Sequence, residues 1–196
     1  KIENAYLLVE EGKIALFGKM EALPLKLRES AEVVDLKGKM VMPAFCDSHT
    51  HIVYAKSREQ EFMDKIAGLS YEEIAKRGGG ILNSADVLRK TSEEELFRIS
   101  SERLCEIMEK GTGAVEIKSG YGLNLESEMK MLRVIKRMKE SYPILIKSTF
   151  LGAHAVGREY VGRQQEYVDM VCREMIPAVA AESLADYVDV FCDKGF

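Results

Sequence analysis

The chain has 196 residues, of which 46% are hydrophobic and 31% charged, and its formal net charge is -4. This composition is typical of a globular protein of one ordinary domain, or of one domain with a small appendage. It has no basic stripe, which argues against nucleic acid as a partner, and no apolar run near the roughly 18 residues that span a bilayer. The four cysteines form no Cys-x-x-Cys pair, so we expect free thiols in a cytoplasmic protein.

Residues 1–42 are expected to form part of a small β-domain. Residues 4–18 contain two short apolar runs on either side of Glu-Glu-Gly-Lys, a pattern typical of a β-hairpin. Residues 33–42 repeat the pattern around a second glycine turn, and Pro43 ends the region.

From Pro43 onward the chain alternates strand-like and helical segments, which predicts parallel strands joined by helical crossovers. The predicted strands cover 45–53, 113–118, 144–151 and 187–192, and the main predicted helices cover 91–110, 125–140 and 165–182, the last interrupted at Pro177.

Two architectures have this order of elements, the doubly wound sheet and the (β/α)8 barrel. No Gly-x-Gly-x-x-Gly turn follows the first strand, as a nucleotide-binding doubly wound sheet would require. Gly78-Gly-Gly80 follows an expected helix over 71–77, and we interpret it as a flexible loop or a helix stop. The positions of the polar residues favour the barrel.

Two of the three histidines, His49 and His51, lie one residue apart at the end of the first predicted strand. Side chains at i and i+2 of a strand point to the same face, so both imidazoles can reach one metal ion. The apolar residues Phe45 and Cys46 predict that this strand is buried, where polar side chains without partners are costly. Asp47 lies in register and would ligate the ion or orient a histidine. A chance pair on an amphipathic strand remains the alternative.

Polar residues also follow the next two strands. His154 ends the segment Phe150-Leu-Gly-Ala-His154, and Tyr121 lies within Lys118-Ser-Gly-Tyr-Gly-Leu123. Taken alone, His154 is as consistent with an ordinary loop histidine as with a functional residue. Tyr121 taken alone is better explained as a packed aromatic in a glycine turn. Because the carboxyl ends of barrel strands form the active-site face, their shared location favours a functional role.

The segment Pro43-Ala-Phe-Cys-Asp-Ser-His-Thr-His51 resembles the Pro-Gly-Phe-x-Asp-x-His-x-His strand of the amidohydrolase superfamily. The similarity covers nearly the whole chain, and Ala44 and Lys56 depart from it where glycine is usual. Further segments are similar to the imidazolonepropionase family within that superfamily: Ser57-Arg-Glu-x-Glu61, Ser70-Tyr-Glu-Glu-Ile-Ala75 with Gly78-Gly-Gly-Ile81, Glu116-Ile-Lys-Ser-Gly-Tyr-Gly-Leu123, Glu128-Met-Lys-Met-Leu132, Thr149-Phe-Leu-Gly-Ala-His154 and Val188-Asp-Val-Phe-Cys192.

The resemblance implies an α/β fold: part of a small β-sandwich domain over 1–42, then the first half of a (β/α)8 TIM-type barrel over 43–196. It also implies hydrolysis of the cyclic amide 4-imidazolone-5-propanoate to N-formimidoyl-L-glutamate in histidine degradation. One divalent metal ion, zinc or iron, would be bound by His49 and His51. Arg58 would bind the substrate carboxylate, Tyr121 would contact the substrate, and His154 would donate to its ring carbonyl.

A complete (β/α)8 barrel takes about 250 residues, and this chain supplies four strands after Pro43. The resemblance implies further metal ligands, a histidine from the fifth strand and an aspartate from the eighth, which we expect beyond Phe196. We therefore expect a protein about twice as long. We expect it to bind a small-molecule substrate, and to bind neither nucleic acid nor a membrane. Whether it forms a homodimer is left open.

Two alternatives remain open at this point. The chain could belong to another amidohydrolase, such as a hydantoinase or dihydroorotase, in which a carboxylated lysine bridges two metal ions; Lys194 lies just past the fourth predicted strand. It could also be a non-catalytic fragment with an incomplete site.

Overall fold

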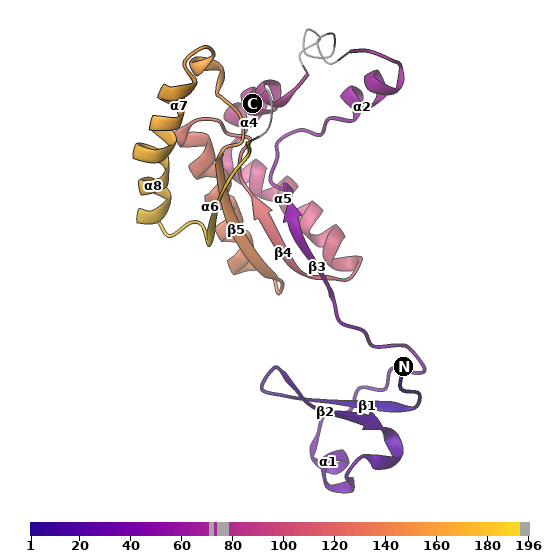
Figure 1. Ribbon diagram of the computed structural model, residues 1–196. Helices are drawn as coiled ribbons and strands as arrows, with labels where there is room; N and C mark the ends of the chain where they lie inside the picture. Colours follow the sequence, from indigo (N-terminus) through magenta and orange to yellow (C-terminus); the bar gives the residue numbers. More distant parts are fainter. Residues whose placement is uncertain (71–72, 74–78, 193–196) are drawn as a thin grey trace. The chain divides into compact units, whose positions relative to one another are not determined.

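The computed structural model describes residues 1–70, 73 and 79–192 (Figure 1). The chain divides into two compact units, Lys1–Pro43 and Ala44–Phe196. Within the described residues, no helix is long and apolar enough to cross a membrane.

The first unit is built around a β-hairpin. Strands β1 (Ala5–Glu10) and β2 (Lys13–Lys19) pair antiparallel, as the sequence predicted. The two turn residues, Glu11 and Gly12, have φ of 50° and 74°, the left-handed conformation that two-residue hairpin turns favour. A short 3-10 helix, η1 (Met20–Ala22), and helix α1 (Leu25–Ser30) follow.

The second predicted hairpin, over residues 33–42, is wrong. The glycine turn is present, because Lys37 and Gly38 both have positive φ and the Lys39 N–H donates to the Leu36 carbonyl. The flanking residues form no strand, however, and Val33 and Val34 are 69% and 73% exposed. An alternating apolar pattern becomes a strand only when a neighbouring strand pairs with it, and this unit provides none to these residues.

The second unit contains a parallel four-stranded sheet in the order β3-β4-β5-β6. This is the α/β arrangement of a partial TIM-type barrel that the sequence predicted. Its strands are β3 (Phe45–Thr50), β4 (Thr112–Lys118), β5 (Leu145–Ala153) and β6 (Tyr187–Val190).

Helical segments connect successive strands, as predicted. Helices α2 (Glu59–Ile66), α4 (Ile81–Lys90) and α5 (Glu93–Glu109) lie between β3 and β4, and α6 (Leu125–Ser141) lies between β4 and β5. The last connection contains η2 (Arg158–Tyr160), α7 (Gln164–Met170), the π-helical turn η3 (Val171–Met175) and α8 (Ile176–Ala181).

Proline and glycine mark two helix boundaries in this unit. The predicted interruption at Pro177 appears as the π-helical turn just before it, where a residue without an N–H disturbs the helical ladder. Gly80, with φ of 89°, directly precedes α4 and therefore marks a helix start, which the sequence analysis did not predict. The helix expected over 71–77 lies outside the described residues except for Glu73.

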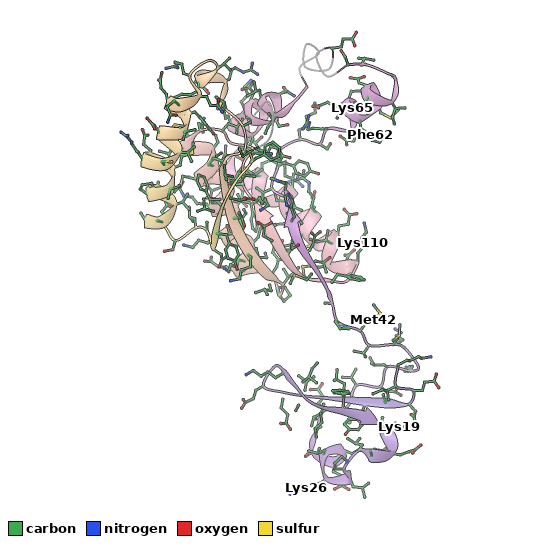
Figure 2. The ribbon with its side chains drawn as sticks, viewed as in Figure 1. Lys19, Lys26, Met42, Phe62, Lys65 and Lys110 are labelled. Atoms are coloured by element: carbon green, nitrogen blue, oxygen red, sulfur yellow. The ribbon has the colours of Figure 1, made fainter. Side chains whose placement is uncertain are left out.

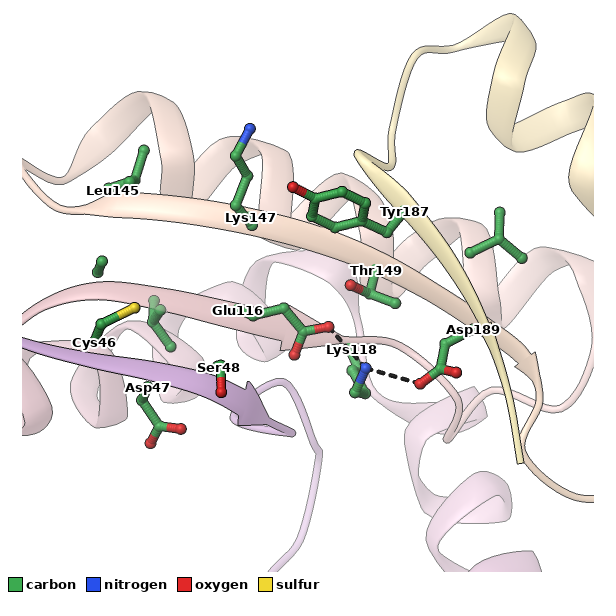
Figure 3. Close-up of a pocket in the computed structure, with 13 residues that line it drawn as sticks. Cys46, Asp47, Ser48, Glu116, Lys118, Leu145, Lys147, Thr149, Tyr187 and Asp189 are labelled. Carbon is green, nitrogen blue, oxygen red and sulfur yellow. Dashed lines mark hydrogen bonds and ion pairs between the residues drawn. The ribbon is translucent and has the colours of Figure 1, made fainter. Parts of the chain in front are cut away.

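Helices α5 and α6 cover one face of the sheet, as Figure 1 shows. Against them the strands bury Val115, Ile117, Ile146 and Phe150, which join the helices' apolar side chains in one core. The opposite face borders a hollow of about 410 Å³, into whose lining it brings the polar side chains of Glu116, Lys118, Lys147, Thr149 and Asp189 (Figure 3).

The prediction that the first barrel strand is buried is wrong. Phe45 is 58% exposed and Cys46 is exposed as well. The physical reason is that β3 lies at the edge of the sheet. Among the described residues, only β4 pairs with it. Side chains of the following helix α2 also project outward, Phe62 and Lys65 among them (Figure 2). All four cysteines are free thiols, as expected.

Candidate metal and substrate site

Four predicted site residues come together at the carboxyl ends of the strands. His49 lies near the end of β3 and His51 just after it, and their ring centroids are 5.6 Å apart. The His51 ring lies 5.2 Å from the ring of Tyr121, which follows β4, and 5.2 Å from that of His154, which follows β5. Tyr121 and His154 are themselves 5.4 Å apart. The expectation that successive strand ends bring their polar residues to one edge is therefore met.

The histidine pair suits a metal ion. Two imidazoles bound to one tetrahedral ion at about 2.0–2.1 Å have centroids about 5 Å apart, close to the observed 5.6 Å. The planes of His49 and His51 are tilted by 59° to each other. The Nδ1 atom of His51 is buried without a hydrogen-bond partner in the described structure. An orphaned buried nitrogen of this kind is suited to ligation.

Burial favours the neutral form of His51. It lowers the pKa of His51 to about 4, with the charges of His154, His49 and Lys118 acting in the same direction. A metal ion binds the unprotonated nitrogen of a neutral imidazole, so this form is ready to ligate at neutral pH.

The structure offers two of the ligands that a metal site needs. Among residues 1–70, 73 and 79–192, no group of three or more His, Cys, Asp or Glu side chains could hold a metal ion. Asp47 is exposed, and its Oδ1 accepts the backbone N–H of His49 at 3.3 Å. The pair His49 and His51 is thus part of a site, since a catalytic zinc-type ion takes three protein ligands.

His154 is held in one orientation by the chain after β4. Its Nδ1 lies 2.9 Å from the carbonyl oxygen of Gly120. A carbonyl only accepts hydrogen bonds, so Nδ1 carries the hydrogen and the neutral ring keeps its lone pair on Nε2. Burial lowers the pKa of His154 and favours this neutral form.

Arg58 is located just before α2, at the edge of this cluster. Its Nε donates to Oε2 of Glu61 at 2.9 Å, and its Nη2 pairs with the same oxygen. Glu61 also accepts the N–H of Gly80 through Oε1 at 3.0 Å. Burial raises the pKa of Tyr121, and the positive charge of Arg58 opposes that rise, so Arg58 lies within electrostatic range of Tyr121.

The sequence around this cluster is shared with known proteins. A family model described as "Amidohydrolase family" matches residues 32–78, which include both histidines and Arg58. Similar proteins include the imidazolonepropionases of Christiangramia forsetii, Flavobacterium psychrophilum and Flavobacterium johnsoniae. Each is 57% identical, over 100% of this chain and 47% of its own length.

The chain is an imidazolonepropionase homologue, and its residues 32–78 match the amidohydrolase family model. It spans about half the length of the curated relatives it matches.

In this imidazolonepropionase homologue, sequence reasoning missed the role of Arg103 on α5. Its Nη1 donates to the carbonyls of Ile52 and Tyr54, at 3.0 and 2.7 Å. Its guanidinium also lies 3.5 Å from the centroid of the Tyr54 ring. Arg103 therefore holds the backbone of the segment that follows His51. Nothing in the sequence distinguishes it from other helical arginines.

Sequence reasoning also missed an ion cluster that crosses the open face of the sheet in this homologue. Lys118 is only 7% exposed, and its Nζ donates to Glu116 at 2.8 Å and to Asp189 at 2.9 Å (Figure 3). Burial opposes the charge on Lys118, but the two carboxylates outweigh it and raise the pKa of the lysine. All three residues lie in segments that carry the family resemblance, but the contact of Lys118 with Asp189 joins two of these segments and is visible only in the fold.

Proposed function

We propose that the protein containing this chain hydrolyses the ring amide of 4-imidazolone-5-propanoate to N-formimidoyl-L-glutamate, using one divalent metal ion, zinc or iron. The observation that carries the proposal is 57% identity to imidazolonepropionases along the whole chain, which includes the cluster of His49, His51, Tyr121 and His154. The expected partner is this small-molecule substrate.

His49 and His51 would hold the metal ion, since their ring centroids are 5.6 Å apart and His51 has a buried Nδ1 without a hydrogen-bond partner among the described residues. When bound, a divalent ion lowers the pKa of water to about 7 and acts as a Lewis acid on the amide carbonyl. Two ligands are too few for a catalytic ion, so the remaining ligands would come from chain beyond residue 196.

Arg58, Tyr121 and His154 would bind the substrate. A guanidinium forms a bidentate pair with a carboxylate, which suits Arg58 to the propanoate group, although it must share or give up Glu61. The Tyr121 hydroxyl is protonated at neutral pH, and burial raises its pKa further, so it can donate to a carboxylate or a ring heteroatom.

The hydrogen bond to Gly120 defines what His154 can do. In the neutral ring, Nε2 accepts a hydrogen bond, for example from a substrate ring N–H. Donation to the ring carbonyl, the role expected from the resemblance, requires the protonated form of His154.

The direct test is to purify the intact protein and measure its metal content and its ring opening of 4-imidazolone-5-propanoate beside hydantoin and dihydroorotate. One metal ion per site and selective hydrolysis of the imidazolone are expected. Two ions per site with activity on hydantoin or dihydroorotate would instead support the other amidohydrolases; Lys194, which that alternative uses, lies outside the described residues.

A second candidate is that the chain by itself is a non-catalytic fragment, which the two-ligand site favours. The chain and the intact protein should be assayed side by side. Weak metal binding and no hydrolysis by the chain alone are expected. Tight metal binding and full activity of this chain would refute the incomplete-site proposal.

A further inference from the structure

Glu128, a carboxylate in the core, binds the loop that carries Tyr121. It lies in the first turn of α6 and is 0% exposed. Its Oε1 accepts the N–H groups of Gly122 and Leu123, at 2.7 and 3.0 Å, and its Oε2 accepts that of Gly120 at 3.0 Å. Three of the four backbone N–H groups of residues 120–123 thus donate to one side chain.

The same loop holds His154. The Gly120 carbonyl accepts the hydrogen on Nδ1 of His154 at 2.9 Å, while the Gly120 N–H donates to Glu128. Gly120 has a φ of 107°, and a Cβ at this position would lie 2.9 Å from that Nδ1. The loop backbone therefore passes directly against the imidazole, and a small shift of Gly120 would change the hydrogen bond to it.

We propose that Glu128 is a positioning residue: by holding the N–H groups of Gly120, Gly122 and Leu123, it presents Tyr121 to the site and keeps His154 in the tautomer with hydrogen on Nδ1 and a free Nε2. The effect on catalysis rests on the proposed function, whereas the effect on the tautomer does not.

A carboxylate is the side chain that fits this role. Burying one is costly, and the neighbouring buried positions of α6, such as Met131 and Leu132, are apolar. Glu128 accepts on both oxygens and has no donor to conflict with the N–H groups around it. Burial raises its pKa, and the hydrogen bonds from Ser119 and the loop N–H groups oppose that rise.

The isosteric substitution Glu128→Gln tests the proposal in the intact protein. A glutamine can place its oxygen toward Gly122 and Leu123 or toward Gly120, but its NH₂ group then faces an N–H on the other side. We expect the ring nitrogen NMR shifts of His154 to change from the Nδ1–H tautomer to a mixture, and kcat/KM to fall at least tenfold with unchanged metal content.

Asn124→Ala is the matched control, because Asn124 Oδ1 caps the same helix through the Ser127 N–H at 2.8 Å and accepts no N–H from residues 120–123. It should destabilise the protein while leaving the tautomer and kcat/KM unchanged. If Glu128→Gln does not fold, Glu128→Asp, which withdraws the carboxylate by one methylene, should show a smaller change in the same direction.

A Glu128 variant that retains the wild-type tautomer and kcat/KM overturns the proposal. So does an Asn124→Ala protein with equal losses of both, because the effect would then follow from helix stability alone. If the wild type does not open imidazolonepropanoate but the tautomer changes in Glu128→Gln, the proposed function fails and the positioning role of Glu128 stands.

Discussion

The rings of His51 and His154 stack, with centroids 5.2 Å apart and an angle of 18° between their planes. The two residues follow β3 and β5, which are separated in the sheet by β4. Tyr121, which follows β4, contacts both rings. Residues from three neighbouring strand ends thus contact one another, which brings the proposed metal ligand His51 beside the proposed substrate-binding residues Tyr121 and His154.

Replacing either His49 or His51 with alanine should remove most of the bound metal from the intact protein, because each supplies one ligand. Metal content after dialysis measures this. His154→Ala and Tyr121→Phe are the controls, and both should retain metal while kcat/KM falls. Full occupancy in both ligand variants would refute the metal assignment, and metal loss in His154→Ala would make His154 a ligand.

Arg58→Lys should raise KM about tenfold with little change in kcat, because a point charge replaces a bidentate fork on the substrate carboxylate. Steady-state kinetics of the intact protein measure the effect. Lys65→Met, which removes a positive charge from the last turn of the helix that follows Arg58, should leave KM unchanged. An unchanged KM in Arg58→Ala would show that Arg58 does not bind the carboxylate.

Arg103→Lys should lower the free energy of unfolding by about 1–3 kcal/mol, because it breaks the paired bonds to the Ile52 and Tyr54 carbonyls and the stacking on Tyr54. Urea denaturation of the intact protein measures this, and metal affinity should fall as well. Arg98→Lys is the control on the same helix. Arg98 pairs with Glu95 and Glu102 at the surface, so its replacement should change stability by less than about 0.5 kcal/mol.

Lys118→Met should destabilise the intact protein by about 3–5 kcal/mol, because it leaves the largely buried carboxylate of Glu116 without its cation. Glu116 already has one buried oxygen without a partner within the described residues. The double substitution Lys118→Met with Glu116→Gln removes the uncompensated charge and should recover much of the loss. Equal stability of the single and double variants in thermal unfolding would contradict this account.

Asp186 should make stability depend on pH under acidic conditions. Burial opposes its charge, but the Ser148 N–H at 2.9 Å together with Lys147 and Lys139 holds the pKa of Asp186 below its usual 3.8. Its contribution is present above the unfolded-state pKa and is lost as pH falls through the lower folded-state pKa. Between pH 6 and pH 3, wild type should therefore lose more unfolding free energy than Asp186→Asn, and equal losses would exclude the effect.

Local patterns in the sequence predicted the features that depend on neighbouring residues. The pair Glu11-Gly12 predicted a hairpin because its turn needs positive φ. Ser92 begins α5 by accepting the Glu95 N–H, close to the predicted start of the helix at residue 91. The alternation of strands and helices predicted the parallel sheet, and His-x-His predicted that both rings share one strand end. Each of these rests on geometry that repeats within a few residues.

Only the tertiary structure decided which residues meet across the sheet. Residues 33–42 carry a strand pattern but have no strand beside them, and Phe45 is exposed because β3 lies at an edge. Lys118 on β4 pairs with Asp189 on β6. Arg103 on α5 likewise binds the Ile52 and Tyr54 carbonyls in the loop after β3. The sequence determined by itself which side chains each strand end carries. Their distances and ring orientations depend on strand order and register, because pairing between distant segments sets both.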